Sequence, residues 1–171
     1  MLILMKDIPE IICNFLTANN IGYNRIFHNP ITTIDEGRTI ALSTGIEPCK
    51  SLFLVDRQKQ FYLFLTLCEG HVDLKNLAKV IQSSRLSFVD AATLETNLNT
   101  VPGAVSPLSL IFDCNQKVNS VIDRRILTNR ELILALCVND QSVVVETQDF
   151  INHFFVACNH NNYRLIDIQA L

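Results

Sequence analysis

The apolar residues of this chain follow two spacings, and the first is the spacing of helices. From Ile8 to Leu16 they recur every three or four positions, which predicts a helix with one buried face. Asp7 is placed to cap this helix, Pro9 suits its first turn, and residues 19–22 end it. Further helices are predicted to begin at the caps Thr33 and Asp73, to span residues 91–98, and to follow the cap Thr147, with an apolar stripe of Phe150, Ile151, Phe154, Phe155 and Cys158.

The second spacing is that of strands. Residues 51–55 and 61–67 are aromatic-rich apolar runs on either side of a polar turn, which predicts a hairpin of two largely buried strands. Short strands are also predicted at residues 23–28, 86–89, 118–123, 132–138, 142–145 and 163–168. Because helices and strands alternate irregularly, with hairpins among them, we expect an α/β fold with a mixed, barrel-like sheet wrapped by helices.

Composition supports a single domain over residues 1–171. The chain is 49% apolar and 18% charged, which is ordinary for a globular protein and disfavours disorder. Its formal net charge of −3 argues against a protein that coats long nucleic acid, so any nucleic-acid contact should be local, at one patch. The basic residues look scattered along the chain: Arg57, Lys59, Lys75, Lys79, Arg85, Arg124 and Arg125.

The six cysteines are interpreted as reduced thiols. The chain is too long to need disulfide staples, most of its cysteines lie in apolar runs, and the apolar start is too short for a secretory signal. No apolar run reaches membrane-spanning length. We therefore expect a cytoplasmic protein with no membrane contact. Cys and His do not cluster at zinc-binding spacing, so we expect no metal site and no cofactor.

Familiar catalytic signatures such as a nucleophile elbow or a phosphate-binding glycine loop are absent. Lys50 instead stands where a turn enters a buried strand, from which its ammonium group could meet a phosphate or carboxylate. The alternative is a surface lysine whose stem passes the strand end. Cys49 next to it could be an activated nucleophile or a small apolar filler.

Two other segments carry candidate residues. In Pro102-Gly-Ala-Val-Ser-Pro107, two prolines pin the backbone and Gly103 allows close approach to a ligand, although the segment could be only a tight connection. Exposed N–H groups there could orient a carbonyl or an oxyanion. His28, in His28-Asn-Pro-Ile-Thr-Thr, could be a base or a phosphate contact, or a structural histidine. His71, His153 and His160 lie in polar or helical surface contexts and are given no role.

In their shared order and spacing, these pieces resemble one family. The order runs from His28-x-Pro through Lys50-Ser-Leu-Phe-Leu-Val-Asp, Asp73-Leu-Lys-x-Leu-Ala-Lys and Leu86-Ser-Phe to the Pro102–Pro107 segment. It is similar to the YbaK/prolyl-tRNA-synthetase-associated editing domains, and most similar to the free-standing prolyl-tRNA deacylases of the PrdX/ProX type. The resemblance covers about residues 8–166.

The resemblance implies hydrolysis of the ester that joins a wrong amino acid to the 3′ end of a tRNA. It implies that Lys50 contacts the terminal nucleotide or its phosphate and that Gly103 supplies backbone to position the aminoacyl group. Water would attack the carbonyl, helped by the ribose hydroxyl of the substrate. Other expected substrate-binding residues are His28, Thr32, Ala104, Val105, Ser106, Pro107, Ala135 and Asn139.

One position departs from the family pattern. Relatives often carry His-Pro-x-x-Asn on a late strand, but this chain reads Ala135-Leu-Cys-Val-Asn139, with alanine at the histidine position. A methyl group there removes a hydrogen-bond partner and enlarges the pocket. The leading hypothesis is a trans-editing deacylase acting on Ala-tRNA(Pro). The alternatives are a weak or inactive homologue that binds tRNA or a synthetase, and a non-tRNA hydrolase that uses Cys49.

The expected partners are a tRNA acceptor end carrying a wrong amino acid and, in some settings, prolyl-tRNA synthetase. The sequence leaves the oligomeric state open, with a monomer expected.

Overall fold

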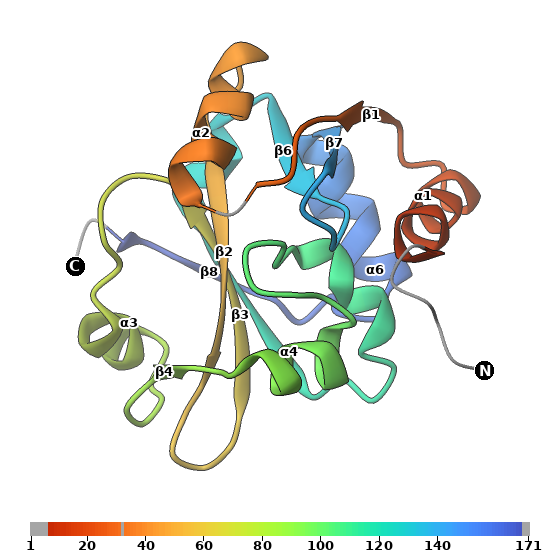
Figure 1. Ribbon diagram of the computed structural model, residues 1–171. Coiled ribbons are helices and arrows are strands. Elements are labelled where there is room, and N and C mark those ends of the chain that lie inside the picture. The colour runs from red at the N-terminus through yellow and green to blue at the C-terminus, as the bar shows by residue number, and fades with distance from the viewer. Residues whose placement is uncertain (1–6, 32, 169–171) are drawn as a thin grey trace.

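The chain folds into two β-sheets with helices around them (Figure 1). The computed structural model describes residues 7–31 and 33–168. The larger sheet has the strand order β4-β2-β3-β5-β8, and the smaller has the order β1-β7-β6. The strands are β1 (Tyr23–Phe27), β2 (Cys49–Val55), β3 (Phe61–Leu67), β4 (Ser87–Phe88), β5 (Val118–Asp123), β6 (Glu131–Ala135), β7 (Gln141–Glu146) and β8 (Arg164–Ile166).

The larger sheet is mixed, as the sequence predicts. β2 pairs antiparallel with both β3 and β4, whereas β5 pairs parallel with β3 and with β8. In the smaller sheet all pairings are antiparallel. The predicted α/β class is therefore confirmed, but over the described residues the strands form two open sheets rather than one closed barrel.

Both faces of the central strands of the larger sheet are buried because neighbouring residues of β2, β3 and β5 enter different clusters. On β3, Leu63 and Leu65 join the main core, which also holds α1 (Ile8–Ala18) and the C-terminal helical segment. Phe64 points to the other face, where Leu77 of α3 (Leu74–Val80) packs against it. This double burial explains why the hairpin reads as two almost continuous apolar runs.

These helices begin where the sequence predicts, but not every predicted capping hydrogen bond forms. Thr33 caps α2 (Ile34–Ser43) with a complete capping box, and Asp73 accepts hydrogen bonds from the first N–H groups of α3. α4 (Ala91–Leu98) is capped by Asp90. Asp7 lies at the N-cap of α1, but its side chain makes no capping hydrogen bond.

The last helix departs from the prediction. Thr147 is its first residue rather than its cap, and its buried hydroxyl has no hydrogen-bond partner among the described residues. The helix runs through α5 (Thr147–Asp149), a π-helical segment at Phe150–Phe154, and α6 (Phe155–Ala157). The wider turn still keeps the predicted apolar stripe on the core, with Phe150 stacked on Phe154 at 5.0 Å between ring centroids.

Candidate active site

A cavity of about 460 Å³ lies between the two sheets. Its walls come from α2, from β2 of the larger sheet, from β6 and β7 of the smaller sheet, and from the segment around Gly103. These pieces are far apart in sequence, and the cavity is large enough for a small organic ligand. Besides Gly103, five candidate residues predicted from the sequence border it directly: Cys49, Lys50, Val105, Ser106 and Ala135.

Lys50 lies on β2 opposite Thr66 of β3, at the end of the strand that opens onto the cavity. Its Nζ donates a hydrogen bond of 2.6 Å to the backbone carbonyl of Gly70, in the loop that follows β3. This bond is exposed to solvent, so the ammonium can exchange it for an anionic ligand at small cost. Lys50 thus lies at the start of a strand, as the sequence predicts, and the cavity lies beside it.

Gly103 lies in the tight turn that the two prolines of this segment predict. The Ala104 N–H donates to the Val101 carbonyl at 3.0 Å, which makes Pro102 and Gly103 the central residues of a β-turn. Gly103 has φ +86°, the value that the third position of a type II turn requires and that glycine adopts without strain. The turn therefore holds Gly103 against the cavity in one conformation.

Replacing Gly103 with alanine should lower the free energy of unfolding by about 1–2 kcal/mol, because an L-residue is strained at positive φ. An added Cβ would meet only the Ile31 carbonyl oxygen at 3.8 Å, an ordinary contact, so the cost comes from the backbone alone. Urea unfolding measures it. The matched control is Gly22→Ala, where φ is not positive and no atom lies within 4 Å. Equal stability of the two variants would contradict this account.

A buried threonine ties this turn to the smaller sheet. The Thr100 hydroxyl lies 2.9 Å from the carbonyl oxygen of Ala104 and 3.2 Å from that of Cys137, and it is fully buried. Ala104 is buried beside it rather than bordering the cavity. Ser106 starts the 3₁₀ helix η2 (Pro107–Phe112), which the sequence did not predict, and its hydroxyl accepts from the Leu108 N–H. Pro107 is buried in that helix.

His28 and Ala135 come together through Ser142. Ala135 presents only a methyl group to the cavity and lies opposite Ser142 in the β6–β7 pairing. His28 Nε2 lies 2.9 Å from Ser142 Oγ, and Ser142 also borders the cavity. Asn139 contributes backbone, since its carbonyl accepts from the Ile31 N–H at 2.6 Å. Thr32 lies outside the described residues.

Cys49 is not an activated nucleophile. Burial raises the pKa of its thiol to about 12, with proximity to Cys68 as a further cause, although Lys50 is its neighbour in sequence. The thiol donates weakly to the Ile133 carbonyl at 3.5 Å. Cys49 is half-buried and borders the cavity, but its raised pKa disfavours the thiolate that an attack on an ester requires, which argues against the hydrolase hypothesis that used Cys49.

Three residues that border the cavity were missed by sequence reasoning. Arg38 of α2 adds a second cation, Phe88 of β4 adds an aromatic ring that is 62% exposed, and Ser142 adds a hydroxyl. Each looks ordinary in its own segment. The predicted environment of one histidine was also wrong: His160 is buried, at 1% exposure, rather than on the surface.

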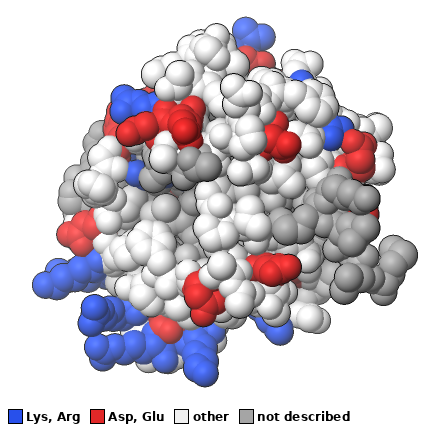
Figure 2. Space-filling model, in the orientation of Figure 1, with Lys and Arg blue, Asp and Glu red and all other residues white. Residues whose placement is uncertain are grey.

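The basic residues are less scattered than the sequence suggests. Lys75, Lys79 and Arg85 border one groove beside α3, and the Arg57 N–H donates to Ser84, which borders the same groove. Figure 2 shows Lys and Arg side chains gathered in this region at the lower left, while the rest of the visible face is mixed or neutral. Among the described residues, none of these four cations is in an ion pair. They form one local basic patch.

Comparisons with known proteins agree on one family. The aminoacyl-tRNA editing domain model matches residues 28–153. The prolyl-tRNA editing protein ProX of Acetoanaerobium sticklandii is 29% identical over 163 residues, which cover 95% of this chain and 98% of that protein. Two crystal structures share the fold. A hypothetical protein has a TM-score of 0.72 at 13% identity, covering 91% of this chain and 97% of that one. A proposed trans-editing enzyme for prolyl tRNA synthetase has a TM-score of 0.70 at 15% identity, covering 94% and 95%.

Proposed function

The chain belongs to the aminoacyl-tRNA editing domain family, and from that premise we propose that it is a trans-editing deacylase whose substrate is Ala-tRNA(Pro). Membership in the family makes it a hydrolase of the ester between an amino acid and a tRNA. Our proposal goes beyond family membership in three respects: the substrate, the residues of the site, and the action of the chain as one free-standing editing domain in the cytoplasm. Among the described helices, none is both long and apolar enough to cross a membrane.

The observation that carries the proposal is the composition of the cavity. Two cations, Lys50 and Arg38, border it, and none of its described lining residues is acidic. Such a site favours the phosphate of a terminal nucleotide. The remainder is largely apolar, with Ile133, Leu134 and the Ala135 methyl group on the β6 wall. An apolar wall without a charged group suits a small uncharged side chain such as that of alanine.

The basic patch beside α3 supports a nucleic-acid substrate. It is connected to the cavity through the β4 region, because Arg85 and Leu86 border the groove while Phe88 and Val89 border the cavity. Unpaired Lys and Arg side chains attract the phosphate backbone. A chain with a net charge of −3 can therefore still hold an acceptor end at one place.

The test is a deacylation panel. Purified protein is incubated with labelled Ala-tRNA(Pro), Cys-tRNA(Pro) and Ser-tRNA(Pro), and loss of the ester is followed over time. We expect Ala-tRNA(Pro) to be cleared fastest, and correctly charged Pro-tRNA(Pro) serves as the control that should persist. If none of the three mischarged substrates is hydrolysed faster than in buffer, the proposal fails.

Ala135 favours a second candidate, a catalytically weak or inactive homologue that binds tRNA or prolyl-tRNA synthetase. Its methyl group can neither donate nor accept a hydrogen bond at this point of the cavity wall. Salt-dependent binding of a tRNA acceptor end with no turnover in the same panel would support this candidate over the first.

A further inference from the structure

Phe88 is a large apolar side chain that the fold leaves in solvent at the border of the cavity. It lies on β4 and is 62% exposed. Among the described residues, the other large exposed apolar side chains are Phe27, Leu42 and Val156, and none of these borders the cavity. Single exposed apolar residues are common on protein surfaces, so it is the place of Phe88, rather than its exposure alone, that sets it apart.

The ring of Phe88 has no aromatic or cationic partner among the described residues. The exposed ring of Phe27 differs in this respect, because the guanidinium group of Arg25 lies over it at 4.9 Å from the ring centroid. An aromatic ring whose face meets solvent beside a cavity is suited to stacking on a planar ligand group such as a nucleobase.

The register of the larger sheet places Phe88 in line with Lys50. Phe88 pairs directly with Leu54 of β2, so their side chains lie on the same face of the sheet. Lys50 precedes Leu54 by four positions on the same strand, and the alternation of side chains puts it on that face too. Along β2 the two positions are about 13 Å apart, at about 3.3 Å per residue.

The edge of β2 between these positions is open to the cavity. Among the described residues, β4 pairs only with Leu54 and Val55, so no strand lies beside Cys49–Phe53 on that edge. All five residues of this stretch border the cavity. Figure 1 shows α2 beside the start of β2 and β4 beside its end. A ligand can therefore lie along β2, from Lys50 to Phe88.

The two ends of this row differ in chemistry, as the two ends of a nucleotide do. At one end are the cations Lys50 and Arg38, which attract a phosphate, and none of the described residues that border the cavity is acidic. At the other end is the aromatic ring, which attracts a base. The flexible stem of Lys50 shortens the gap, so that one nucleotide spans it. Arg85, three positions before Phe88, borders the basic groove, where the phosphates of preceding nucleotides can continue.

We propose that Phe88 is the stacking platform for the terminal base of the tRNA, an inference that rests on the proposed deacylase function. The phosphate of the same nucleotide lies on Lys50, and the ribose with its aminoacyl ester lies between the two. Phe88 is thus a binding residue that holds the ester in the cavity and takes no part in bond breaking. Its contribution belongs to KM rather than to kcat.

A binding test uses the absence of tryptophan from the chain, since Phe88→Trp then introduces a single indole at this position. Titration with AMP should quench its fluorescence, because adenine stacks on the indole. Ribose 5-phosphate carries the phosphate without a base and should not quench. The matched control is Val156→Trp on α6, at a position that is 58% exposed and outside the cavity lining, which AMP should not quench.

Two results of this titration would overturn the proposal: no quenching of Phe88→Trp by AMP, or equal quenching of the two tryptophan variants. Adding Lys50→Met to Phe88→Trp should weaken AMP binding about tenfold, because the phosphate loses its cation. Unchanged AMP affinity in that double variant would contradict the placement of one nucleotide across both residues.

The kinetic test separates stacking from simple apolar contact. Phe88→Ala and Phe88→Leu should each raise KM for the mischarged tRNA about tenfold, with kcat within about twofold of wild type, because both lose the aromatic face. Phe88→Tyr keeps that face and should retain the wild-type KM. Val156→Ala is the control and should change neither constant. A wild-type KM in Phe88→Leu would show that the ring is not needed.

Failure of the stacking site and failure of the proposed function give different results. If AMP quenches Phe88→Trp but no mischarged tRNA is hydrolysed, the proposed function fails while the base site stands. If mischarged tRNA is hydrolysed by Phe88→Leu with the wild-type KM, the function stands and Phe88 has no part in it.

Discussion

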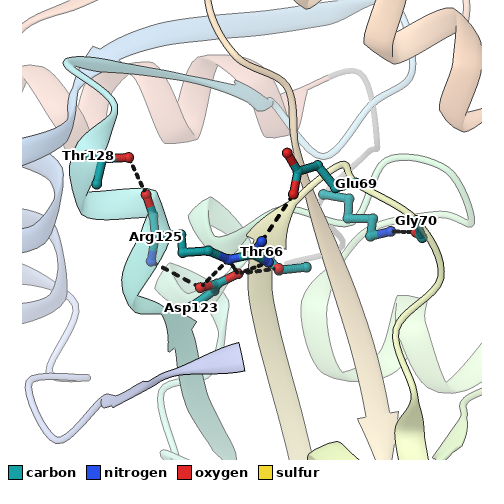
Figure 3. A network of polar contacts seen from close by, with 7 residues as sticks. Thr66, Glu69, Gly70, Asp123, Arg125 and Thr128 are labelled. Atoms are coloured by element: carbon teal, nitrogen blue, oxygen red, sulfur yellow. Dashed lines mark hydrogen bonds and ion pairs between the residues drawn. The ribbon is translucent and has the colours of Figure 1, made fainter. Parts of the chain in front are cut away.

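Replacing Asp123 with alanine should lower the free energy of unfolding by about 3 kcal/mol, the largest loss we expect from a polar residue in this chain. Asp123 is completely buried at the end of β5. Its carboxylate accepts a 2.7 Å hydrogen bond from the Thr66 hydroxyl and a 2.8 Å bond from Nη2 of Arg125, as well as the Arg125 backbone N–H at 3.0 Å (Figure 3).

Removal of this carboxylate leaves the buried Thr66 hydroxyl without an acceptor and Arg125 without its main counter-ion. The hydrogen bond to Asp123 is also the chief reason why the pKa of Arg125 is raised. Urea unfolding measures the loss. Glu69→Ala is the matched control, because Glu69 pairs with the same arginine but is 64% exposed, and such a pair contributes about 1 kcal/mol or less. A Glu69 variant that is destabilised as much as Asp123→Ala would refute this ranking.

Lys50→Ala should lower kcat/KM for the mischarged tRNA at least tenfold, which corresponds to about 1.4 kcal/mol of transition-state or binding free energy. The ammonium group borders the cavity, and its hydrogen-bond partner among the described residues is the exposed Gly70 carbonyl, so the loss should appear in activity rather than in stability. Steady-state kinetics and urea unfolding on the same preparation separate the two effects.

Lys50→Met tests the charge, because it keeps an unbranched side chain of similar length and should be as impaired as the alanine variant. Lys117→Ala is the control, since Lys117 is exposed and lies outside the cavity lining. An unchanged kcat/KM in Lys50→Ala would remove Lys50 from the site.

Local sequence signals predicted most of the fold because they act within a few residues. The Thr33 capping box and the hairpin of β2 and β3 both form as expected. The predictions that fail depend on tertiary contacts. Asp7 has the right residue type and position for a cap, yet makes no capping bond, and the π-helical turn at Phe150–Phe154 has the same apolar spacing as an ordinary helix.

The residues of the candidate site also differ in whether a local sequence signal predicts them. Lys50 and Gly103 stand out in sequence because a lysine at the start of a buried strand and a glycine between two prolines are locally unusual. Ser142 has no local signal, since it is an ordinary residue of a β-branched strand. It becomes chemically distinct only because His28, 114 positions earlier, is brought to 2.9 Å from its hydroxyl by the β1–β7 pairing.

The cavity between the two sheets also links ligand binding to folding. Its walls are contributed by α2, β2, the Gly103 turn and the β6–β7 pair, so no part of the unfolded chain contains the binding surface. A molecule that fills the cavity binds the folded protein and not the unfolded chain, and mass action then makes the fold more stable as the concentration of that molecule rises. The protein should therefore be most resistant to unfolding when a ligand of this cavity is abundant.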